Sequence, residues 1–141
     1  MPTETIAAAR WIYSLLAADS TLQSLVVNRI YAYRAPQGGA FPAIVFQVQS
    51  AQADTRVVGD QRLASRFTMV VKAIGQGADF IAVQPIAERV DQLLEAASGS
   101  NVDGVIVACV RDRPLEMLET SDPGIDYVHL GGLYNLTVVG A

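Results

Sequence analysis

The sequence predicts an α+β domain in which an antiparallel β-sheet of about four to five strands packs against an N-terminal helix and a longer central helix. Apolar residues recur at helical spacing in two segments, residues 3–18 and 79–97, and most of the remainder shows strand-like alternation. The chain has 141 residues, of which 51% are hydrophobic and 17% charged. This is enough for one domain over residues 1–141 that folds without disulfides or metal.

Residues 3–18 form the first predicted helix. Glu4 in its first turn complements the helix dipole, and Asp19 ends the pattern. Ser20-Thr21-Leu22-Gln23 is a capping-box sequence that predicts a second, short helix. The apolar residues that define the two helices are Ile6, Trp11, Ile12, Leu15, Leu16, Leu22, Leu25 and Val26.

Three segments of the first half predict strands. Residues 29–33 are a brief strand-like run, followed by a Pro- and Gly-rich loop at 34–39. Alternating residues predict longer strands at 43–50 and 62–73. Residues 51–61 between them are polar and end in a Gly-Asp turn signal, which predicts a hairpin loop or a longer arm.

The central helix carries the clearest apolar stripe. Asp79 is a candidate N-cap. Because Pro85 lies inside the segment, the helix either begins near Gln84 with Pro85 in its first turn or is kinked there. Ser98-Gly99-Ser100 is expected to close it. The stripe consists of Ile86, Val90, Leu93, Leu94 and Ala97.

The C-terminal third predicts β structure. Residues 102–110 are one strand, and residues 113–120 continue it or pair with it. Residues 121–124 are a strong turn signal before a final strand at 125–139. Gly131-Gly132 within that strand indicates a bulge or a close approach by the backbone of a neighbour.

The titratable residues offer no convincing catalytic or metal site, so we predict no enzyme and no cofactor. Cys109, the only cysteine, lies in an apolar run and is expected to be buried and unreactive. His129, the only histidine, is on a strand, where a surface or edge position is commoner than a role as general base. One Cys and one His cannot form a structural zinc site, and the spacing of the acids matches no EF-hand.

The charge balance argues against binding to nucleic acid or membranes. The formal net charge is −4, whereas sequence-independent binding to DNA or RNA uses Lys and Arg to neutralise phosphates. No apolar run approaches the ~20 residues needed to span a bilayer. The N-terminus lacks the basic region of a signal peptide. We therefore expect the chain to be made, and kept until assembly, in a reducing cytoplasm.

Several short strings and the order of the elements are informative together. Ala18–Leu22 ends the first helix, Arg29-Ile30-Tyr31 and Arg34–Gly38 follow, and Pro42 opens a strand. The strand at 66–74, the Ala-rich helix after Asp79 and the C-terminal strand continue the order. In these features nearly the whole chain resembles the tail-completion or tail-terminator proteins of long-tailed bacteriophages and related prophages.

The resemblance implies an α+β subunit that assembles into a ring, commonly of six subunits, without catalysis. Such a ring caps the head-proximal end of the tail tube, stops its polymerisation and joins the tail to the head-side connector or stopper protein. It would place the chain in the tail and neck of the virion, assembled in the host bacterial cytoplasm. DNA would pass through without specific binding, as the acidic balance favours.

A ring needs two different patches on each subunit, because its contacts are head to tail. Segments 51–61 and 119–126 are candidates for contact with the neighbouring subunit or the tail tube; the alternative is ordinary solvated loops. The candidate interface residues are Asp54, Arg56, Asp60, Arg62, Arg66, Glu119 and Asp122. Asp112 and Glu116 are candidate channel-facing acids.

Two other functions stay open on the sequence alone. The first is another ring of the neck, such as a head-closure or connector protein. The second, of a different class, is a small-molecule-binding α+β regulatory domain, which would need a concave pocket with convergent polar groups.

Overall fold

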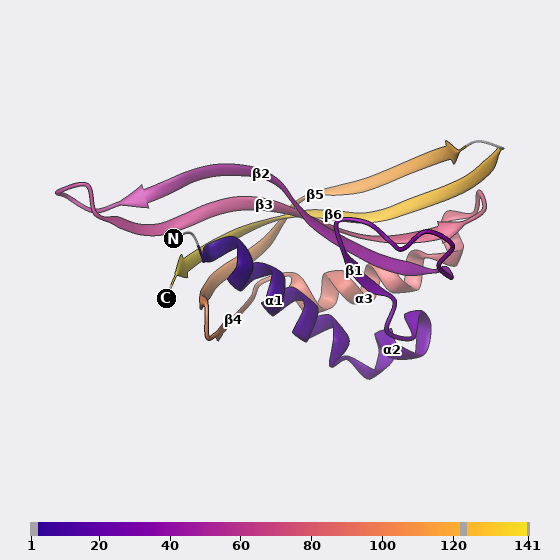
Figure 1. Cartoon of the computed structure of the whole chain (residues 1–141), viewed down its shortest axis with the longest axis horizontal. Coiled ribbons are helices and arrows are strands. Elements are labelled where there is room, and N and C mark those ends of the chain that lie inside the picture. Colours follow the sequence, from indigo (N-terminus) through magenta and orange to yellow (C-terminus); the bar gives the residue numbers. More distant parts are fainter. Residues whose placement is uncertain (1–2, 122–123, 141) are drawn as a thin grey trace.

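The computed structural model describes residues 3–121 and 124–140 and has an α+β fold. Its six-stranded sheet has the order β1-β2-β3-β6-β5-β4, and the helices lie together on one side of it (Figure 1). β1 runs parallel to β2, and the other neighbouring strands are antiparallel. The sheet is therefore mixed, because β1 runs parallel to β2, and it has six strands where four to five were expected, because the short edge strands β1 and β4 join the four long ones. The strands are β1 (Ile30–Ala32), β2 (Ala43–Arg56), β3 (Arg62–Gln76), β4 (Ala97–Asn101), β5 (Gly104–Ser121) and β6 (Ile125–Gly140).

Aspartate side chains cap α2 and η1, whereas a proline marks the first turn of α3. The Asp19 carboxylate accepts a hydrogen bond from the Leu22 backbone N–H (3.0 Å), so the cap of α2 is Asp19, one residue before the predicted capping box. Asp79 caps the 3-10 helix η1, and α3 begins at Gln84 with Pro85 in its first turn. Proline is tolerated there because first-turn N–H groups have no intrahelical partner. The helices are α1 (Glu4–Ala17), α2 (Ser20–Val26), η1 (Phe80–Ala82) and α3 (Gln84–Leu94).

The prediction that Ser98-Gly99-Ser100 closes the central helix is wrong. α3 ends at Leu94, Glu95 is extended, and Ala97–Asn101 form β4, which pairs with the start of β5. Gly99 allows this edge strand to approach α1, since a Cβ there would lie 2.5 Å from the indole Nε1 of Trp11. The conformation of this segment is determined by its packing against α1. The local sequence pattern does not predict that packing.

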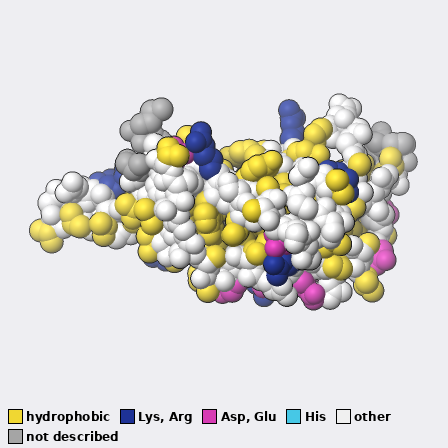
Figure 2. Space-filling view, turned by 90° about the horizontal axis from the view of Figure 1, so that it is seen from below, with side chains coloured by type: hydrophobic (Ala, Val, Ile, Leu, Met, Phe, Trp, Pro, Cys, Tyr) yellow, Lys and Arg dark blue, Asp and Glu magenta, His cyan; other side chains and the backbone are white. Residues whose placement is uncertain are grey.

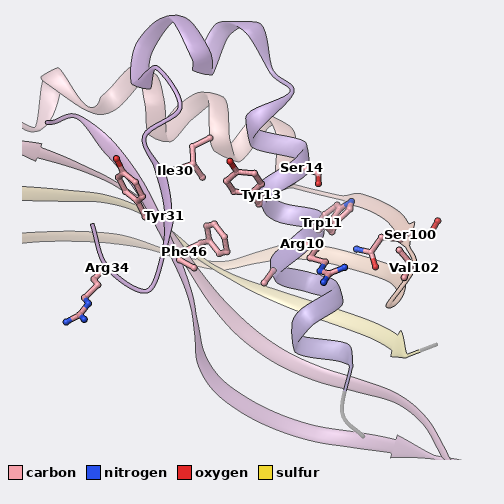
Figure 3. Close-up of a pocket in the computed structure, with 13 residues that line it drawn as sticks. Arg10, Trp11, Tyr13, Ser14, Ile30, Tyr31, Arg34, Phe46, Ser100 and Val102 are labelled. Carbon is pink, nitrogen blue, oxygen red and sulfur yellow. The ribbon is translucent and has the colours of Figure 1, made fainter. Parts of the chain in front are cut away.

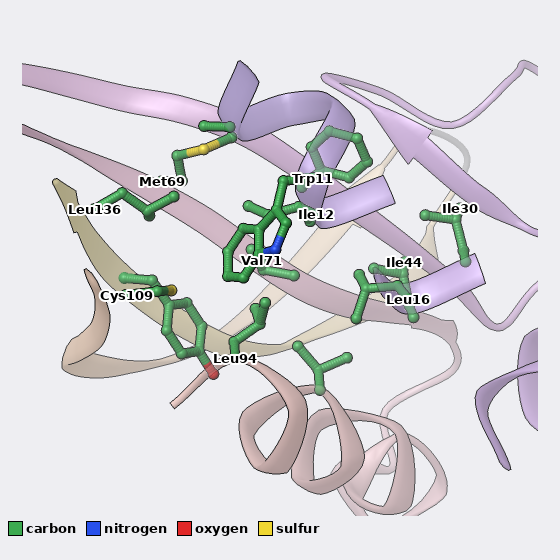
Figure 4. Packing of buried hydrophobic residues seen from close by; sticks show 14 of the residues in the cluster. Trp11, Ile12, Leu16, Ile30, Ile44, Met69, Val71, Leu94, Cys109 and Leu136 are labelled. Atoms are coloured by element: carbon green, nitrogen blue, oxygen red, sulfur yellow. The ribbon is translucent and has the colours of Figure 1, made fainter. Parts of the chain in front are cut away.

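The core lies between the helices and one face of the sheet (Figure 4). Ile12 and Leu16 of α1 are fully buried, and Leu94 of α3 is fully buried beside them. Alternate residues of the central strands, such as Val71 and Leu136, complete this layer. Each large apolar side chain that is fully buried stabilises the fold by roughly 1.5–3 kcal/mol.

Two polar contacts hold the helices in place around this core. The Arg89 guanidinium of α3 donates to both carboxylate oxygens of Asp19, at 3.0 and 2.6 Å, and so joins α3 to the start of α2. The hydrogen bonds from Arg89 lower the pKa of Asp19. On the sheet side, the buried Tyr134 hydroxyl donates to Asp91 of α3 (2.8 Å).

The central β3–β6 pair determines the outline of the molecule. β3 and β6 pair antiparallel from Ser65↔Val138 to Gln76↔Tyr127, so the turns of the β2–β3 and β5–β6 hairpins lie at opposite ends (Figure 1). The accessible surface is 7814 Å². A compact protein of 15.1 kDa would expose roughly 7,100 Å². The extra accessible surface is explained by the two hairpins, which project from the body of the protein.

Gly131 and Gly132 lie in this central pair. Their pairing with β3 is regular, and the register shifts of the β5–β6 pair fall elsewhere, at 106/108 and 111/113. A Cβ at Gly131 would collide with the Val71 carbonyl oxygen and lie 2.5 Å from Lys72 Cα. The interpretation of these two residues as a bulge is therefore wrong, and the close approach is made by the β3 backbone of the same chain and not by a neighbouring subunit.

Gly131→Ala should destabilise the protein strongly, because the new methyl group has no room between the β3 and β6 backbones. We expect the free energy of unfolding, measured by urea denaturation, to fall by about 3 kcal/mol. Gly59→Ala is the matched control: φ there is +97° and a Cβ would meet nothing within 4 Å. It should cost about 1 kcal/mol from backbone strain alone. Equal losses for the two variants would contradict the close approach.

Asp19→Asn should remove an acid-sensitive part of the stability. Asn caps helices as well as Asp does, so the variant isolates the ion pair with Arg89. The folded-state pKa of Asp19 lies below 3.8, so the pair stabilises the fold above that pH and is lost as pH falls through the folded pKa. In urea unfolding, the variant should be less stable at pH 7, and the gap should close below pH 3.8. Asp60→Asn, at an exposed turn, should show no such gap.

Candidate functional site

The far end of the β2–β3 hairpin, residues 53–64, forms the first arm. Strand pairing continues to Arg56↔Arg62, so of the two alternatives for residues 51–61, a hairpin loop or a longer arm, the longer arm is right. The turn carries two apolar residues: Val57 is 42% exposed, and Val58 is completely exposed. In the space-filling view from the helix side, apolar side chains lie at the free end of this arm, on the left (Figure 2). A projecting apolar tip points to a contact with another protein.

The predicted interface residues of the first arm also hold its shape. Arg56 Nη1 donates to the Asp60 carbonyl (2.8 Å), and its Nη2 lies 3.9 Å from Asp54 Oδ2. Asp54 accepts a hydrogen bond from the Ser65 hydroxyl (2.7 Å) across the hairpin. Arg62 Nη2 lies 3.4 Å from the buried Glu4 carboxylate and so ties the arm to α1. Arg66, further along β3, is exposed.

The described residues 116–121 and 124–126, at the far end of the β5–β6 hairpin, form the second arm. Glu119 Oε1 lies 2.9 Å from His129 Nε2, and the Thr120 hydroxyl donates to Asp126 (2.6 Å). Met117 and Leu118 are 41% and 52% exposed. Asp122, the remaining predicted interface residue, lies outside the described residues. The second arm is therefore acidic and apolar, unlike the first arm, whose carboxylates lie beside arginines.

All of the net charge of the chain comes from this C-terminal segment. The ten Lys and Arg residues all precede Pro114, where ten of the fourteen acids balance them. No Lys or Arg follows, so the remaining four acids account for the formal charge of −4. The chain is thus electrically polarised, with one end of the sheet strongly acidic.

The two predicted channel-facing acids lie apart on β5. Asp112 is at a register shift and accepts a hydrogen bond from Arg113 Nε (2.9 Å). Glu116 is opposite Leu130, on the face of the arm that continues the helix side of the sheet. The structure places Glu116 on the second arm, three residues from Glu119. Sequence reasoning had assigned these two acids to different surfaces.

Cys109 and His129 do not form a pair. Cys109 is opposite Leu136 on the core face, whereas His129 is opposite Met117 on the other face of the sheet. Burial raises the pKa of the Cys109 thiol to about 12, as expected for an unreactive cysteine. The expected surface position of His129 is wrong, since its side chain is 7% exposed against Glu119. The described residues contain no group of three or more His, Cys, Asp or Glu that could hold a metal ion.

A groove runs along α1 between the two edge strands. Its larger part has a volume of about 710 Å³ and lies between β1 and the turn after β4 (Figure 3). A smaller part of about 180 Å³ continues beside β2, and the two share Ala9, Ala32 and Phe46. We call the two together the α1 groove. Its side chains include Ile6, Arg10, Trp11, Tyr13, Tyr31, Tyr33, Arg34 and Val102.

Sequence reasoning did not find the α1 groove. In the sequence, Tyr31 and Tyr33 alternate on one strand face, a pattern that is compatible both with core packing and with subunit contact. Trp11 is 8% exposed and belongs to the core, whereas Tyr33 is 64% exposed beside the groove. The apolar periodicity of α1 predicts which of its residues face the sheet. The position of β1 beside the helix determines which of the other α1 residues stay uncovered and line the groove.

Two arms of different chemistry and an open apolar groove define a protein whose working parts are contact surfaces, that is, a structural assembly subunit. The chain belongs to the family of tail completion protein gp17, whose family model matches residues 10–138. It is therefore a structural virion protein of the bacteriophage tail. No helix within the described residues is long and apolar enough to cross a membrane.

A solved structure has the same fold. A chain in the virion of a native gene transfer agent particle matches with a TM-score of 0.68 and 20% sequence identity, over 92% of each chain. At this identity the match supports the fold: the helix layer and the long hairpins are an arrangement that a distant sequence also adopts. No curated protein matches the chain.

Cys109 should resist modification in the folded protein. With its pKa raised to about 12 and its side chain fully buried, very little thiolate is accessible at pH 8. We expect iodoacetamide to label the native protein about a thousandfold more slowly than the urea-unfolded chain. Val58→Cys, at the tip of the first arm, serves as the accessible control. Rapid native labelling of Cys109, confirmed by peptide mapping, would contradict its buried position.

Proposed function

We propose that the chain forms a ring that caps the head-proximal end of the phage tail tube, terminates its polymerisation and joins the tail to the head-side connector. Its work is assembly, without catalysis. The observation that carries this proposal is the pair of oppositely directed arms with different chemistry on a chain of the tail completion family. A head-to-tail ring requires two unlike patches on each subunit besides a surface for the tail tube, and the two arms and the α1 groove are unlike surfaces of this kind.

The first arm is the candidate contact with the tail tube. Its tip exposes Val57 and Val58, whose burial against a partner would be favourable. Hydrogen bonds and the ion pair with Glu4 pre-order the arm, which reduces the entropy lost on binding. Interface residues proposed for this arm and its base are Asp54, Arg56, Asp60, Arg62 and Arg66. Glu119 and Asp122 are proposed for the second arm.

The acidic charge suits a ring through which DNA passes. Carboxylates repel phosphates, so a lumen that exposes acids would let DNA move without binding. We propose that Asp112 and Glu116 face the channel or the end surfaces of the ring. A ring structure with a lumen lined mainly by arginine would overturn this part of the proposal.

The function is tested by adding purified protein to tail tubes and examining the mixture by electron microscopy. We expect added density at one end of each tube and no further growth when tube protein is supplied. Binding to filled heads instead of tube ends would overturn the proposal in favour of another ring of the neck.

A small-molecule-binding role is the second candidate, because the volume of the α1 groove lies within the range of ligand pockets. Its polar groups, however, are spread along the rim. Arg10 is 63% exposed and pairs with Asp103 at 3.1 Å, and Arg34 is exposed on the other side. Family membership favours the structural role over this one.

Replacing both tip valines, Val57→Ser with Val58→Ser, should weaken capping of tubes. The two changes remove apolar area that the tube contact would bury, so we expect about tenfold weaker binding to tube ends in a titration followed by electron microscopy. Ile81→Ser is the matched control, since Ile81 is 74% exposed on η1, at the opposite end of the sheet from the first arm. Unchanged capping by the double variant would remove the first arm from the tube contact.

A further inference from the structure

The α1 groove exposes apolar side chains along its length. Tyr13 and Tyr33 are 48% and 64% exposed, and Ile6 near the start of α1 is 45% exposed. Two guanidinium groups border them. Arg34 is exposed and has no ion pair within the described chain, and Arg10 on α1 is 63% exposed although it pairs with Asp103. An apolar floor with cationic borders suits a segment that is both apolar and acidic.

The second arm has that composition. Leu118 and Ile125 are 52% and 37% exposed at its end, beside Met117. Glu119 keeps 56% of its side chain exposed although one carboxylate oxygen contacts His129. No Lys or Arg follows Arg113 in the chain, and the cation that interacts electrostatically with the arm is Lys72 of β3, close to Glu119. Its charge is thus complementary to the border of the groove.

The arm of one chain cannot reach the groove of the same chain. The β3–β6 pairing directs the β5–β6 turn to the end of the sheet opposite the first arm, and the hairpin rises away from the helix layer there (Figure 1). The groove lies on the helix side, beside α1 (Figure 3). The two complementary surfaces can therefore meet only between two copies of the chain.

We propose that the tip of the second arm of one subunit docks in the α1 groove of a second copy. Leu118 and Glu119 point to opposite faces of β5, so Leu118 lies against Tyr13 on one wall of the groove and Glu119 is directed towards Arg34 on the other wall. The contact joins two different patches, so it repeats from subunit to subunit in one direction, as a ring requires. The inference rests on the proposed ring and names its subunit contact. Opposite charges would also steer the two surfaces together before the apolar side chains meet.

Disulfide trapping between two distinguishable chains tests the contact. One tagged chain carries Leu118→Cys and an untagged chain carries Tyr13→Cys; both positions are exposed, and Cys109 is buried. The chains are mixed with a mild oxidant, copper–phenanthroline, and the products are separated by mass. We expect the mixed dimer in roughly tenfold excess over either homodimer, the enrichment that a weak specific contact gives. Val58→Cys with Tyr13→Cys is the matched control and should give no such excess.

The charge element is tested in the same assay. Arg34→Glu in the Tyr13→Cys chain should lower the yield of mixed dimer several-fold, and so should raising the salt concentration. Arg113→Glu should leave the yield unchanged, because Arg113 lies outside the groove and contacts Asp112. A mixed dimer that is no more abundant than the homodimers, or that is insensitive to Arg34→Glu, would overturn the proposal.

The outcomes for the contact and for the proposed function are separate. Tubes that are capped normally while Leu118→Cys and Tyr13→Cys fail to cross-link would reject the subunit contact and keep the ring. Efficient cross-linking without any binding to tube ends would keep the contact between copies and reject the tail-terminating role. Preferential trapping of Tyr13→Cys with Val58→Cys would assign the groove to the first arm and overturn the inference.

Discussion

The antiparallel pairing of β3 with β6 is the constraint on which the rest of the structure depends. Twelve residue pairs, Ser65↔Val138 to Gln76↔Tyr127, join a hairpin from the first half of the chain to one from the second half. Because the two central strands run in opposite directions, the hairpin turns must lie at opposite ends. Gly131 permits this pairing, since a side chain there would meet the β3 backbone. The two-armed shape follows from one long-range strand pair.

The helix layer explains why the arms differ from the body. α1 has 14 residues, whereas β5 and β6 have 18 and 16 and rise about twice as far per residue. The helices therefore cover only the middle of the sheet, and the hydrophobic core lies there. Beyond the cover, apolar residues such as Val58 and Leu118 contribute little to folding stability. Their exposure is better explained by a partner than by the fold.

Local chemistry predicted much of the helix layer and little of the sheet order. The extent of α1, the start of α3 at Gln84 and the burial of Cys109 follow from apolar periodicity, proline geometry and apolar flanks. The prediction that Ser98-Gly99-Ser100 ends the central helix was wrong. The composition of this segment favours a helix end, whereas packing against Trp11 makes it an edge strand. The direction of the arms and the shape of the α1 groove depend on contacts between residues that are distant in sequence. Hydrophobic periodicity along the chain does not report such contacts. The candidate residues within the described part of the chain are exposed, and the strand register groups Glu116 with Glu119 on the second arm.

The distribution of charge along the chain bears on how neighbouring subunits are oriented, which neither the fold nor the family membership determines. A net charge of −4 spread evenly would disfavour DNA binding and promote solubility, nothing more. Here the chain before Pro114 is neutral, and the C-terminal hairpin carries the whole excess. A polarised subunit interacts differently with a neighbour at each end, because like ends repel and unlike ends attract. Head-to-head pairing through the second arm would place acids against acids, so the charge pattern itself favours a repeating head-to-tail order over a closed symmetric dimer.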